Sequence, residues 1–230
     1  MNDRKIIKIP NVFEKVSKKI FPFPFRCMIV GSSGCGKTTV LYNLTTQKWG
    51  IPSHFLHLFS KSIEQDAYKE LKRAFDKLEA EEDIEVTHFY GDCENLISVD
   101  ECEPDSLVVF YDCVNINQQS LIKDFYVRGR HKNISTIYLT QNYTKIDRQL
   151  IRTNLNYLCI FKQDKKYMKY IYDECVGSEF TFKEFQTVCE SCWKEAYGLL
   201  SIDLTKNLNN GKYRNKFGLE IQSRPPEVKE

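Results

Sequence analysis

The sequence contains no long apolar run. None of its segments approaches the roughly 18 consecutive apolar residues that a membrane-spanning helix requires. The first stretch, MNDRKIIKIPNVFEK, carries charges but no apolar segment of the kind that a secretory signal contains. We therefore expect neither a membrane span nor a secretory signal. The 230 residues suffice to bury one substantial hydrophobic core, which favours a single domain.

The cysteines lack the pairing of a disulfide framework or a structural zinc site. They are nine in number, scattered along the chain, and several lie in apolar runs, where a thiol packs as a small hydrophobe. Only Cys189 and Cys192 have C-x-x-C spacing, and no second pair completes a tetrahedral site. Cys175 and His131 are the residues that a zinc site would have to recruit. Reduced thiols in an intracellular compartment are the better interpretation.

The net charge is only +2, but the charges are unevenly distributed. Twelve acidic residues and one lysine lie between Phe75 and Asp105, whereas eleven lysines or arginines and three aspartates lie between Ile122 and Tyr170. This segregation favours a basic face directed at a polyanion. An ordinary solvated surface explains the same pattern equally well.

Apolar runs and amphipathic segments alternate along the chain. The predicted strands are Phe25–Val30, His54–Ser60, Ile84–Gly91, Ser106–Asp112, Ser135–Gln141, Tyr157–Lys162 and Tyr197–Leu204. The predicted helices are Lys37–Thr46, Ser62–Leu78, Gln118–Val127, Arg148–Asn154, Lys165–Cys175 and Phe182–Trp193. The alternation predicts an α/β fold with a mainly parallel central sheet flanked by helices. Ser106–Asp112, the most apolar run, is expected at its centre.

The sequence shows no internal repeat, and its polar ends lie outside this alternation. We expect a basic N-terminal extension over residues 1–20 and one domain over 21–205. Residues 206–230 are expected to form a polar, flexible tail with a turn at Asn209–Gly211.

The strongest motif follows the first predicted strand. The segment GSSGCGKT matches G-x-x-x-x-G-K-[ST] at every fixed position. Glycines let backbone N–H groups approach a phosphate, and the following helix directs its N-terminus at the same anion. The predicted nucleotide-binding residues are Gly31, Ser32, Ser33, Gly34, Cys35, Gly36, Lys37, Thr38 and Thr39. Lys37 is expected to contact the β and γ phosphates of ATP, and Thr38 to ligate Mg²⁺.

A second acid is expected to hold Mg²⁺, partly through water. Asp112 ends the run SLVVFYD, which would place its carboxylate at the end of a strand near the glycine-rich loop. An aspartate that merely ends a strand in a turn is the alternative. The next residue is Cys113, whereas many P-loop motors place a second carboxylate here to polarise the attacking water. Either another group performs that task or turnover is slow.

Gln141 ends the next predicted strand, STIYLTQ, where an amide could orient water or sense the γ-phosphate. Three arginines, Arg128, Arg130 and Arg152, flank this strand in the sequence. Taken singly, each is better explained by contact with DNA or solvent. We predict that one of the three reaches the nucleotide of a neighbouring subunit, because such an arginine stabilises charge in the transition state.

The succession of these segments resembles a known family. FPFRCMIVGSSGCGKTTVL, SLVVFYD, RGRHKNISTIYLTQNY and IRTNLNYLCIFK have the order and spacing seen in the genome-packaging ATPases of large DNA viruses and virus-like transposons. These form the poxvirus-type branch of the FtsK–HerA superfamily. The resemblance covers roughly Phe21 to Asp203, and the GRHKN, YLTQ and IRTN segments make it specific.

The resemblance implies a P-loop NTPase with a RecA-like core that assembles as a homo-oligomeric ring and drives double-stranded DNA into a capsid. It also implies work inside the host cell at sites of virion assembly, with capsid or portal-like shell proteins as partners. By position, Lys37 and Thr38 bind Mg-ATP, Asp112 is the magnesium-side acid and Gln141 is the sensor. Contacts with DNA would be directed at phosphates and independent of base sequence. His131, Lys132 and Lys145 are our candidates for them.

Three other functions remain open at this point. A small nucleotide kinase has a similar size, but it would need an arginine-rich lid over its second substrate. A nucleotide-binding scaffold, or degenerate ATPase, would bind ATP with little hydrolysis because the acid after Asp112 is missing. A helicase would prefer single strands, and the sequence shows no array of aromatic residues for stacking bases.

Overall fold

The computed structural model describes most of the chain. The described residues are 21–47, 49–51, 55–60, 69, 73, 76–77, 79–80, 85–90, 97–113, 119–149 and 151–221. The expected N-terminal extension, residues 1–20, lies outside them. So does most of the helix predicted over Ser62–Leu78, although the described residues within it are helical.

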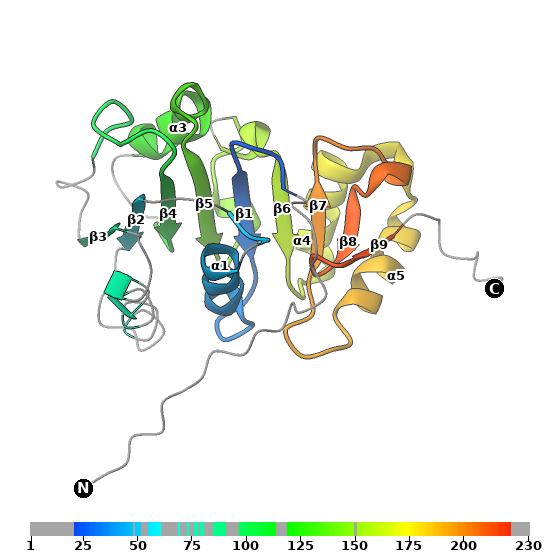
Figure 1. Cartoon of the computed structure of the whole chain (residues 1–230). Coiled ribbons are helices and arrows are strands. Elements are labelled where there is room, and N and C mark those ends of the chain that lie inside the picture. The colour runs from blue at the N-terminus through cyan, green and yellow to red at the C-terminus, as the bar shows by residue number, and fades with distance from the viewer. Residues whose placement is uncertain are drawn as a thin grey trace, which may run out of the picture.

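Within the described residues, nine strands form one sheet (Figure 1). In spatial order they are β3 (Glu85–Tyr90), β2 (Phe55–Ser60), β4 (Leu107–Tyr111), β5 (Ser135–Thr140), β1 (Arg26–Val30), β6 (Tyr157–Ile160), β7 (Leu200–Asp203), β8 (Tyr213–Asn215) and β9 (Leu219–Glu220). The strands from β3 to β6 pair in parallel, and β7, β8 and β9 extend the sheet antiparallel. The predicted parallel sheet is confirmed, with β4 inside it.

Helices cover both faces of the sheet. The longer helices are α1 (Lys37–Thr46), α3 (Gln119–Val127), α4 (Lys165–Ile171) and α5 (Phe182–Cys192). Short 3₁₀ turns lie at Gly129–Lys132, Tyr143–Lys145, Arg152–Asn154, Gly177–Glu179 and Leu208–Asn210, and a π-helical turn, Tyr172–Val176, continues α4. Figure 1 shows α1 in front of the sheet beside β5 and β1. The apolar side chains of α3, α4 and α5 belong to the core of the other face.

Side-chain alternation along the strands builds these two cores. In β1, Cys27 and Ile29 join the core under α1, whereas Met28 and Val30 join the core under the other helices. β4 is divided in the same way and is fully buried from Leu107 to Phe110. A strand buried on both faces needs the continuous apolar run that the sequence shows there. Burial of each large apolar side chain contributes about 1.5–3 kcal/mol, so the strands that carry the loops are rigidly supported.

Three predicted elements differ from the structure. The helix predicted over Arg148–Asn154 is only a 3₁₀ turn, because the Asn156 side chain bonds to the backbone of Pro24 and Arg26 and so fixes β6 beside β1 a few residues later. The helix predicted over Lys165–Cys175 widens into the π-helical turn after Ile171. The last predicted strand, Tyr197–Leu204, begins only at Leu200.

The expectation of a flexible tail from residue 206 is wrong for residues 206–221. This segment forms the predicted turn and then β8 and β9, and it buries Tyr213 and Phe217 almost completely. Phe217 packs against Phe21, Trp49 and Tyr157. Burial of these aromatic side chains orders the segment although its composition is mostly polar. Residues 222–230 lie outside the described residues.

None of the helices in the described ranges has the length and apolar character that crossing a bilayer requires.

Candidate nucleotide-binding site

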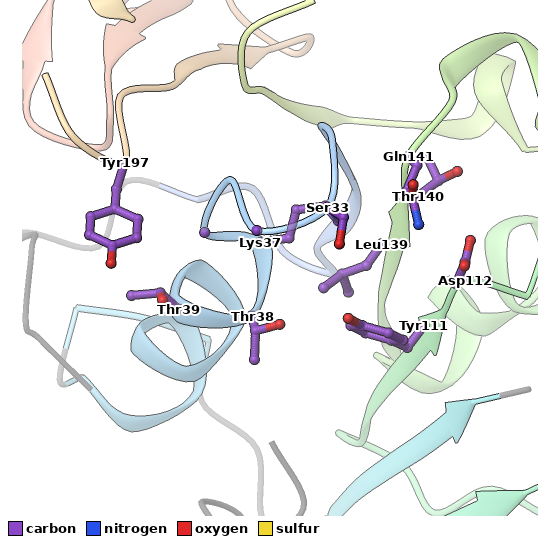
Figure 2. Close-up of a pocket in the computed structure, with 12 residues that line it drawn as sticks. Ser33, Lys37, Thr38, Thr39, Tyr111, Asp112, Leu139, Thr140, Gln141 and Tyr197 are labelled. Carbon is purple, nitrogen blue, oxygen red and sulfur yellow. The ribbon is translucent and has the colours of Figure 1, made fainter. Parts of the chain in front are cut away.

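The site lies where three parallel strands end at the same edge of the sheet. β5 lies between β1 and β4, so Gly31 after β1, Asp112 after β4 and Gln141 after β5 converge there. They surround a hollow of about 220 Å³. Its lining residues are Ser33, Gly34, Gly36, Lys37, Thr38, Thr39, Tyr111, Asp112, Leu139, Thr140, Gln141 and Tyr197 (Figure 2).

The glycine-rich loop adopts a conformation that depends on its glycines. Gly34 and Gly36 have φ angles of 74° and 110°, in the left-handed region that side chains disfavour. A Cβ on Gly31 would lie 2.6 Å from the Cys35 sulfur and from Phe161 Cβ. The loop therefore stays close to β1 and leads directly into α1, whose first N–H groups have no partner within the helix. This arrangement suits a phosphate anion.

Lys37 is the first residue of α1 and lies under the loop. Its side chain is almost buried, and Nζ donates to the carbonyl oxygens of Gly31 (2.7 Å) and Ser32 (2.8 Å). Burial lowers the pKa of Lys37, and the neighbouring Cys35 and Asp112 partly offset this. The ammonium is thus held at the place where a bound phosphate would need a cation.

Asp112 and Thr38 supply oxygen atoms on the other side of the hollow. Asp112 has a φ of 53°, a strained angle for a residue with a side chain, and its N–H donates to the Leu139 carbonyl at 3.0 Å. The Tyr111 hydroxyl hydrogen-bonds with Thr38, and burial raises the pKa of this tyrosine. A carboxylate and a hydroxyl are the hard oxygen ligands that Mg²⁺ prefers, so the donor set fits this cation.

Cys113 does not face the hollow. It is fully buried, and its sulfur lies 3.6 Å from the Phe59 carbonyl oxygen and 3.5 Å from the Tyr111 carbonyl oxygen. The thiol belongs to the core under α3. Residue 113 therefore offers no group to a water molecule in the hollow.

Gln141 is exposed at the end of β5 and lines the hollow with Asp112. Figure 2 shows both side chains on the same side of the glycine-rich loop, with Tyr111 below them. The Thr140 hydroxyl and the backbone of Asn142 hydrogen-bond to each other, which stabilises the chain on either side of Gln141. The structure thus brings together the loop, Asp112 and Gln141, as the sequence predicts.

The three arginines lie away from this edge. Arg128 and Arg130 precede β5 and Gln141 follows it, so the length of the strand, about 20 Å, separates them. Arg128 binds the carboxylate of Asp100 at 2.8 and 2.9 Å and lies 3.6 Å from that of Asp124.

Arg152 and Arg130 differ sharply in their surroundings. Arg152 is largely buried, binds both carboxylate oxygens of Glu174 at 2.8 and 2.9 Å, and lies over the ring of Tyr143. Arg130 is exposed and has no ion pair within the described part of the chain. It is therefore the arginine best placed to reach another molecule.

The candidate DNA-contacting residues lie on opposite edges of the sheet. His131 and Lys132 are in the turn before β5, whereas Lys145 is in the turn after it. Lys132 donates to the carbonyl oxygens of Asp100 and Cys102, and so holds the loop before β4. His131 and Lys145 are exposed.

Four lining residues were not predicted from the sequence: Tyr111, Leu139, Thr140 and Tyr197. The first three flank predicted site residues on β4 and β5, so their strand positions could have revealed them. No sequence signal marks Tyr197, because it follows α5 and is distant from the motif in the chain.

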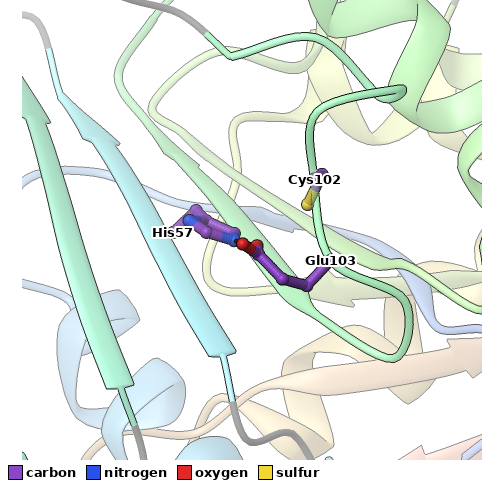
Figure 3. A group of neighbouring side chains, drawn as sticks. All are labelled: His57, Cys102 and Glu103. Carbon is purple, nitrogen blue, oxygen red and sulfur yellow. Dashed lines mark hydrogen bonds and ion pairs between the residues drawn. The ribbon is translucent and has the colours of Figure 1, made fainter.

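A group of potential metal ligands lies outside the hollow (Figure 3). Among the described residues, His57, Cys102 and Glu103 are the group whose ligand atoms all lie within 4.8 Å of one another. His57 Nε2 and Glu103 Oε2 are 3.1 Å apart and join β2 to the loop before β4. Burial raises the pKa of the Cys102 thiol, which disfavours the thiolate that binds metals. We infer that the contact between His57 and Glu103 has a structural role and attaches this loop to β2.

The eight cysteines in the described ranges are free thiols. Cys189 and Cys192 are buried on α5, and burial raises the pKa of Cys192 to about 11. Cys189, Cys192, Cys175 and His131 form no group of three clustered ligand atoms within those ranges.

Known proteins resemble the chain in sequence and in structure. A family model described as Poxvirus A32 protein matches residues 13–178. No curated protein matches the sequence. The DNA-packaging ATPase B204 from Sulfolobus Turreted Icosahedral Virus is similar in structure, with a TM-score of 0.54 and 13% identity, over 79% of this chain and 93% of that chain.

A second similar structure is the genome packaging NTPase B204 from Sulfolobus turreted icosahedral virus 2 in complex with ATP-gammaS. Its TM-score is 0.52 at 9% identity, over 79% of this chain and 93% of that chain. At such identities the likeness establishes the fold. The chain has the α/β fold of P-loop NTPases, with a RecA-like core and a mainly parallel sheet flanked by helices.

Proposed function

The chain belongs to the Poxvirus A32 protein family, and from this premise we propose that it is an ATP-driven translocase that packages double-stranded DNA into a viral or virus-like capsid. The observation that carries the proposal is the convergence of the glycine-rich loop, Asp112 and Gln141 on one hollow, with β5 between β1 and β4. Related packaging enzymes with this fold are described as ATPases or NTPases.

In this proposal, different residues bind the phosphates, hold Mg²⁺ and orient the attacking water. The backbone from Gly31 to Thr39 and the Lys37 ammonium bind the phosphates of ATP. Thr38 and Asp112 would hold Mg²⁺, which when bound neutralises charge that develops on the phosphates. Gln141 orients the attacking water.

Turnover is expected to be slow. Residue 113 is a cysteine where a second carboxylate would be needed, and its thiol is buried away from the hollow. An amide such as Gln141 can position water but is a poor proton acceptor. The same observation favours one competing function, a scaffold that binds ATP and hardly hydrolyses it. A nucleotide kinase is less well supported, since none of the three arginines lies at the edge of the hollow.

The deciding experiment is steady-state ATP hydrolysis by the purified protein with and without duplex DNA. The translocase predicts turnover that DNA stimulates and that is absent from a Lys37→Ala variant. A scaffold predicts ATP binding without turnover under either condition. Phosphoryl transfer to a nucleotide, independent of DNA, would instead indicate a kinase.

We propose that DNA phosphates are bound in part by exposed lysines. Lys162, Lys165 and Lys166 are exposed beyond the end of β6, and none has an ion pair within the described residues. Lys165 and Lys166 occupy the first turn of α4, directly after its N-cap residue Asp164. Three exposed cations against the single carboxylate of Asp164 leave this segment positively charged, which favours contact with a polyanion.

The double variant Lys165→Ala/Lys166→Ala is expected to bind duplex DNA more weakly at every sequence tested. The slope of log affinity against log salt should become shallower by about 0.9 for each phosphate that the variant no longer neutralises. Fluorescence anisotropy across a salt series measures both effects. Lys183→Ala, at an exposed lysine on α5, is the matched control and should change neither. An unchanged salt slope in the double variant would remove these lysines from the DNA interface.

We also propose that the protein acts as a ring in which Arg130 completes the site of a neighbouring subunit. Arg130→Ala should lower DNA-stimulated turnover on the order of 10³-fold or more, whereas Arg128→Ala should have a small effect. Mixing Arg130→Ala protein with Lys37→Ala protein should restore activity, because about a quarter of random interfaces then combine an intact loop with an intact arginine. If the mixture is no more active than either variant alone, Arg130 does not have this role. Full activity of the Arg130→Ala variant alone would also exclude it.

A further inference from the structure

The hollow has two chemically different ends. Asp112 and Gln141 lie at one end, and Tyr197 lies at the other, beyond Lys37 and next to Thr39 (Figure 2). The acidic and amide groups suit Mg²⁺ and the terminal phosphate, whereas an aromatic ring suits neither. The hollow of about 220 Å³ is also smaller than the roughly 300–1,000 Å³ of typical ligand pockets, so part of a nucleotide would extend past its rim.

Tyr197 is unusual both in exposure and in backbone conformation. Its side chain is 39% exposed, which places it with Phe23 and Tyr170 as the exposed large hydrophobic residues of the described chain. Its φ angle is 56°, which bulky residues rarely adopt. Strain of this kind persists only where the surrounding structure imposes it, and it concentrates at binding sites.

The turn that carries Tyr197 is anchored on both sides. Before it, Trp193 Nε1 donates to the Ile160 carbonyl at the end of β6 at 3.0 Å, and Glu195 pairs with Lys216 at 3.1 Å. After it, the Gly198 N–H donates to the Glu195 carbonyl at 3.0 Å. A Cβ on Gly198 would lie 2.2 Å from the Cys192 carbonyl oxygen, so the tight turn requires glycine. The ring is therefore held in place although it is exposed.

The ring of Tyr197 packs against the glycine-rich loop itself. A Cβ on Gly36 would lie 2.5 Å from Tyr197 Cδ1, which shows how closely the ring approaches the loop backbone. The contact places an aromatic surface directly beside the first turn of α1. A triphosphate that lies along the loop from Gln141 would bring its nucleoside to this surface.

We propose that Tyr197 is the base-binding residue of the site, and that its ring stacks on the purine or pyrimidine ring of a nucleoside triphosphate. The inference rests on the proposed nucleotide binding and adds the orientation of the ligand, with its γ-phosphate at Asp112 and its base at Tyr197. Stacking is available to every base because each has a π face. The residue thus increases affinity for nucleosides over bare polyphosphate and discriminates weakly between ATP and GTP.

Calorimetric titration with Mg-ATP and with Mg-tripolyphosphate tests the proposal. Tyr197→Ala is expected to weaken ATP binding about tenfold, the scale of one aromatic–base stack, and to leave the affinity for tripolyphosphate unchanged. Tyr197→Phe keeps the ring and should bind ATP within about twofold of the wild type. Tyr170→Ala, at a comparably exposed tyrosine that does not line the hollow, is the matched control.

Two outcomes would overturn the assignment. If Tyr197→Ala binds ATP as the wild type does, while Lys37→Ala binds it more weakly, nucleotide binding stands and the base contact fails. If ATP and tripolyphosphate affinities fall together, Tyr197 merely supports the loop through Gly36. Failure of the proposed function has a different signature, since the wild-type protein would then bind neither ligand.

Discussion

Lys37→Ala is expected to abolish ATP hydrolysis and to weaken ATP binding by about 10- to 150-fold. Hydrogen bonds to a charged group contribute about 1.5–3 kcal/mol, which corresponds to that range of affinity. The structure holds the ammonium under the loop, within 2.8 Å of two loop carbonyl oxygens, so it needs little reorganisation to meet a phosphate. Hydrolysis should fall further than binding, because charge on the phosphates grows in the transition state.

The measurement is phosphate release over a range of ATP concentrations, together with direct ATP titration. Lys183→Ala, on α5, is the control for loss of a lysine elsewhere. The thermal midpoint of Lys37→Ala should stay close to that of the wild type, since the relief of desolvation of an almost buried ammonium offsets the loss of its hydrogen bonds to the loop carbonyls. Wild-type turnover in a folded Lys37→Ala protein would contradict the assignment of the whole site.

Asp112→Asn is expected to reduce hydrolysis by at least about 10²-fold while ATP binding stays within a few-fold of the wild type. The amide has the same shape as the carboxylate but lacks the negative charge that attracts Mg²⁺. Lys37 and the glycine-rich loop are unchanged, so the phosphates keep most of their contacts. Phosphate release and ATP titration separate the two effects.

The backbone at this position makes asparagine the informative substitution. Asp112 has a φ of 53°, and asparagine tolerates the left-handed region better than most residues do. Asp105 provides a matched control because it also has a positive φ, 61°, but does not line the hollow. Asp105→Asn should therefore hydrolyse ATP as the wild type does. Equal activity of the two variants would exclude Asp112 as the magnesium-side acid.

Most of the motif-bearing core can be predicted from the sequence. The predicted bounds of β1, the loop and α1 agree with the structure almost to the residue, because glycine spacing and the helix start are local properties of the chain. β4 is recognisable as an inner strand because burial on both faces leaves an uninterrupted apolar run. Because parallel strands end at a common edge of the sheet, the predicted strands also imply that Asp112 and Gln141 lie near the loop.

The surroundings of the three arginines could not be predicted from their positions in the sequence. Their sequence positions around β5 suggest one group near the sensor residue, yet the strand places Arg128 and Arg130 at the opposite edge. Glu174, which engages Arg152, lies 22 residues further along the chain. Ion pairs between distant segments leave no periodic signal, so only the folded chain identifies Arg130 as the member of the three without an ion pair among the described residues.

The segment after α5 departs from the prediction for a related reason. Tyr197 belongs to an apolar stretch that resembles a strand, but the tight turn at Gly198 keeps it out of β7. Residues 206–221 look polar, but Tyr213 and Phe217 find buried sites against elements far away in the sequence. Average composition does not reveal how a few large side chains will be buried.

The glycine-rich loop, the strands that support it and the two polar residues that face it can be identified from the amino-acid sequence alone. These features depend on local backbone preference and on apolar periodicity, and both are properties of residues that are close together in the sequence. The folded chain was needed to show that Cys113 turns into the core, that Arg128 and Arg152 form ion pairs with distant residues and that Tyr197 lies against Gly36. Each of these depends on the close approach of segments that are distant in sequence, and the packing of the whole sheet determines that approach.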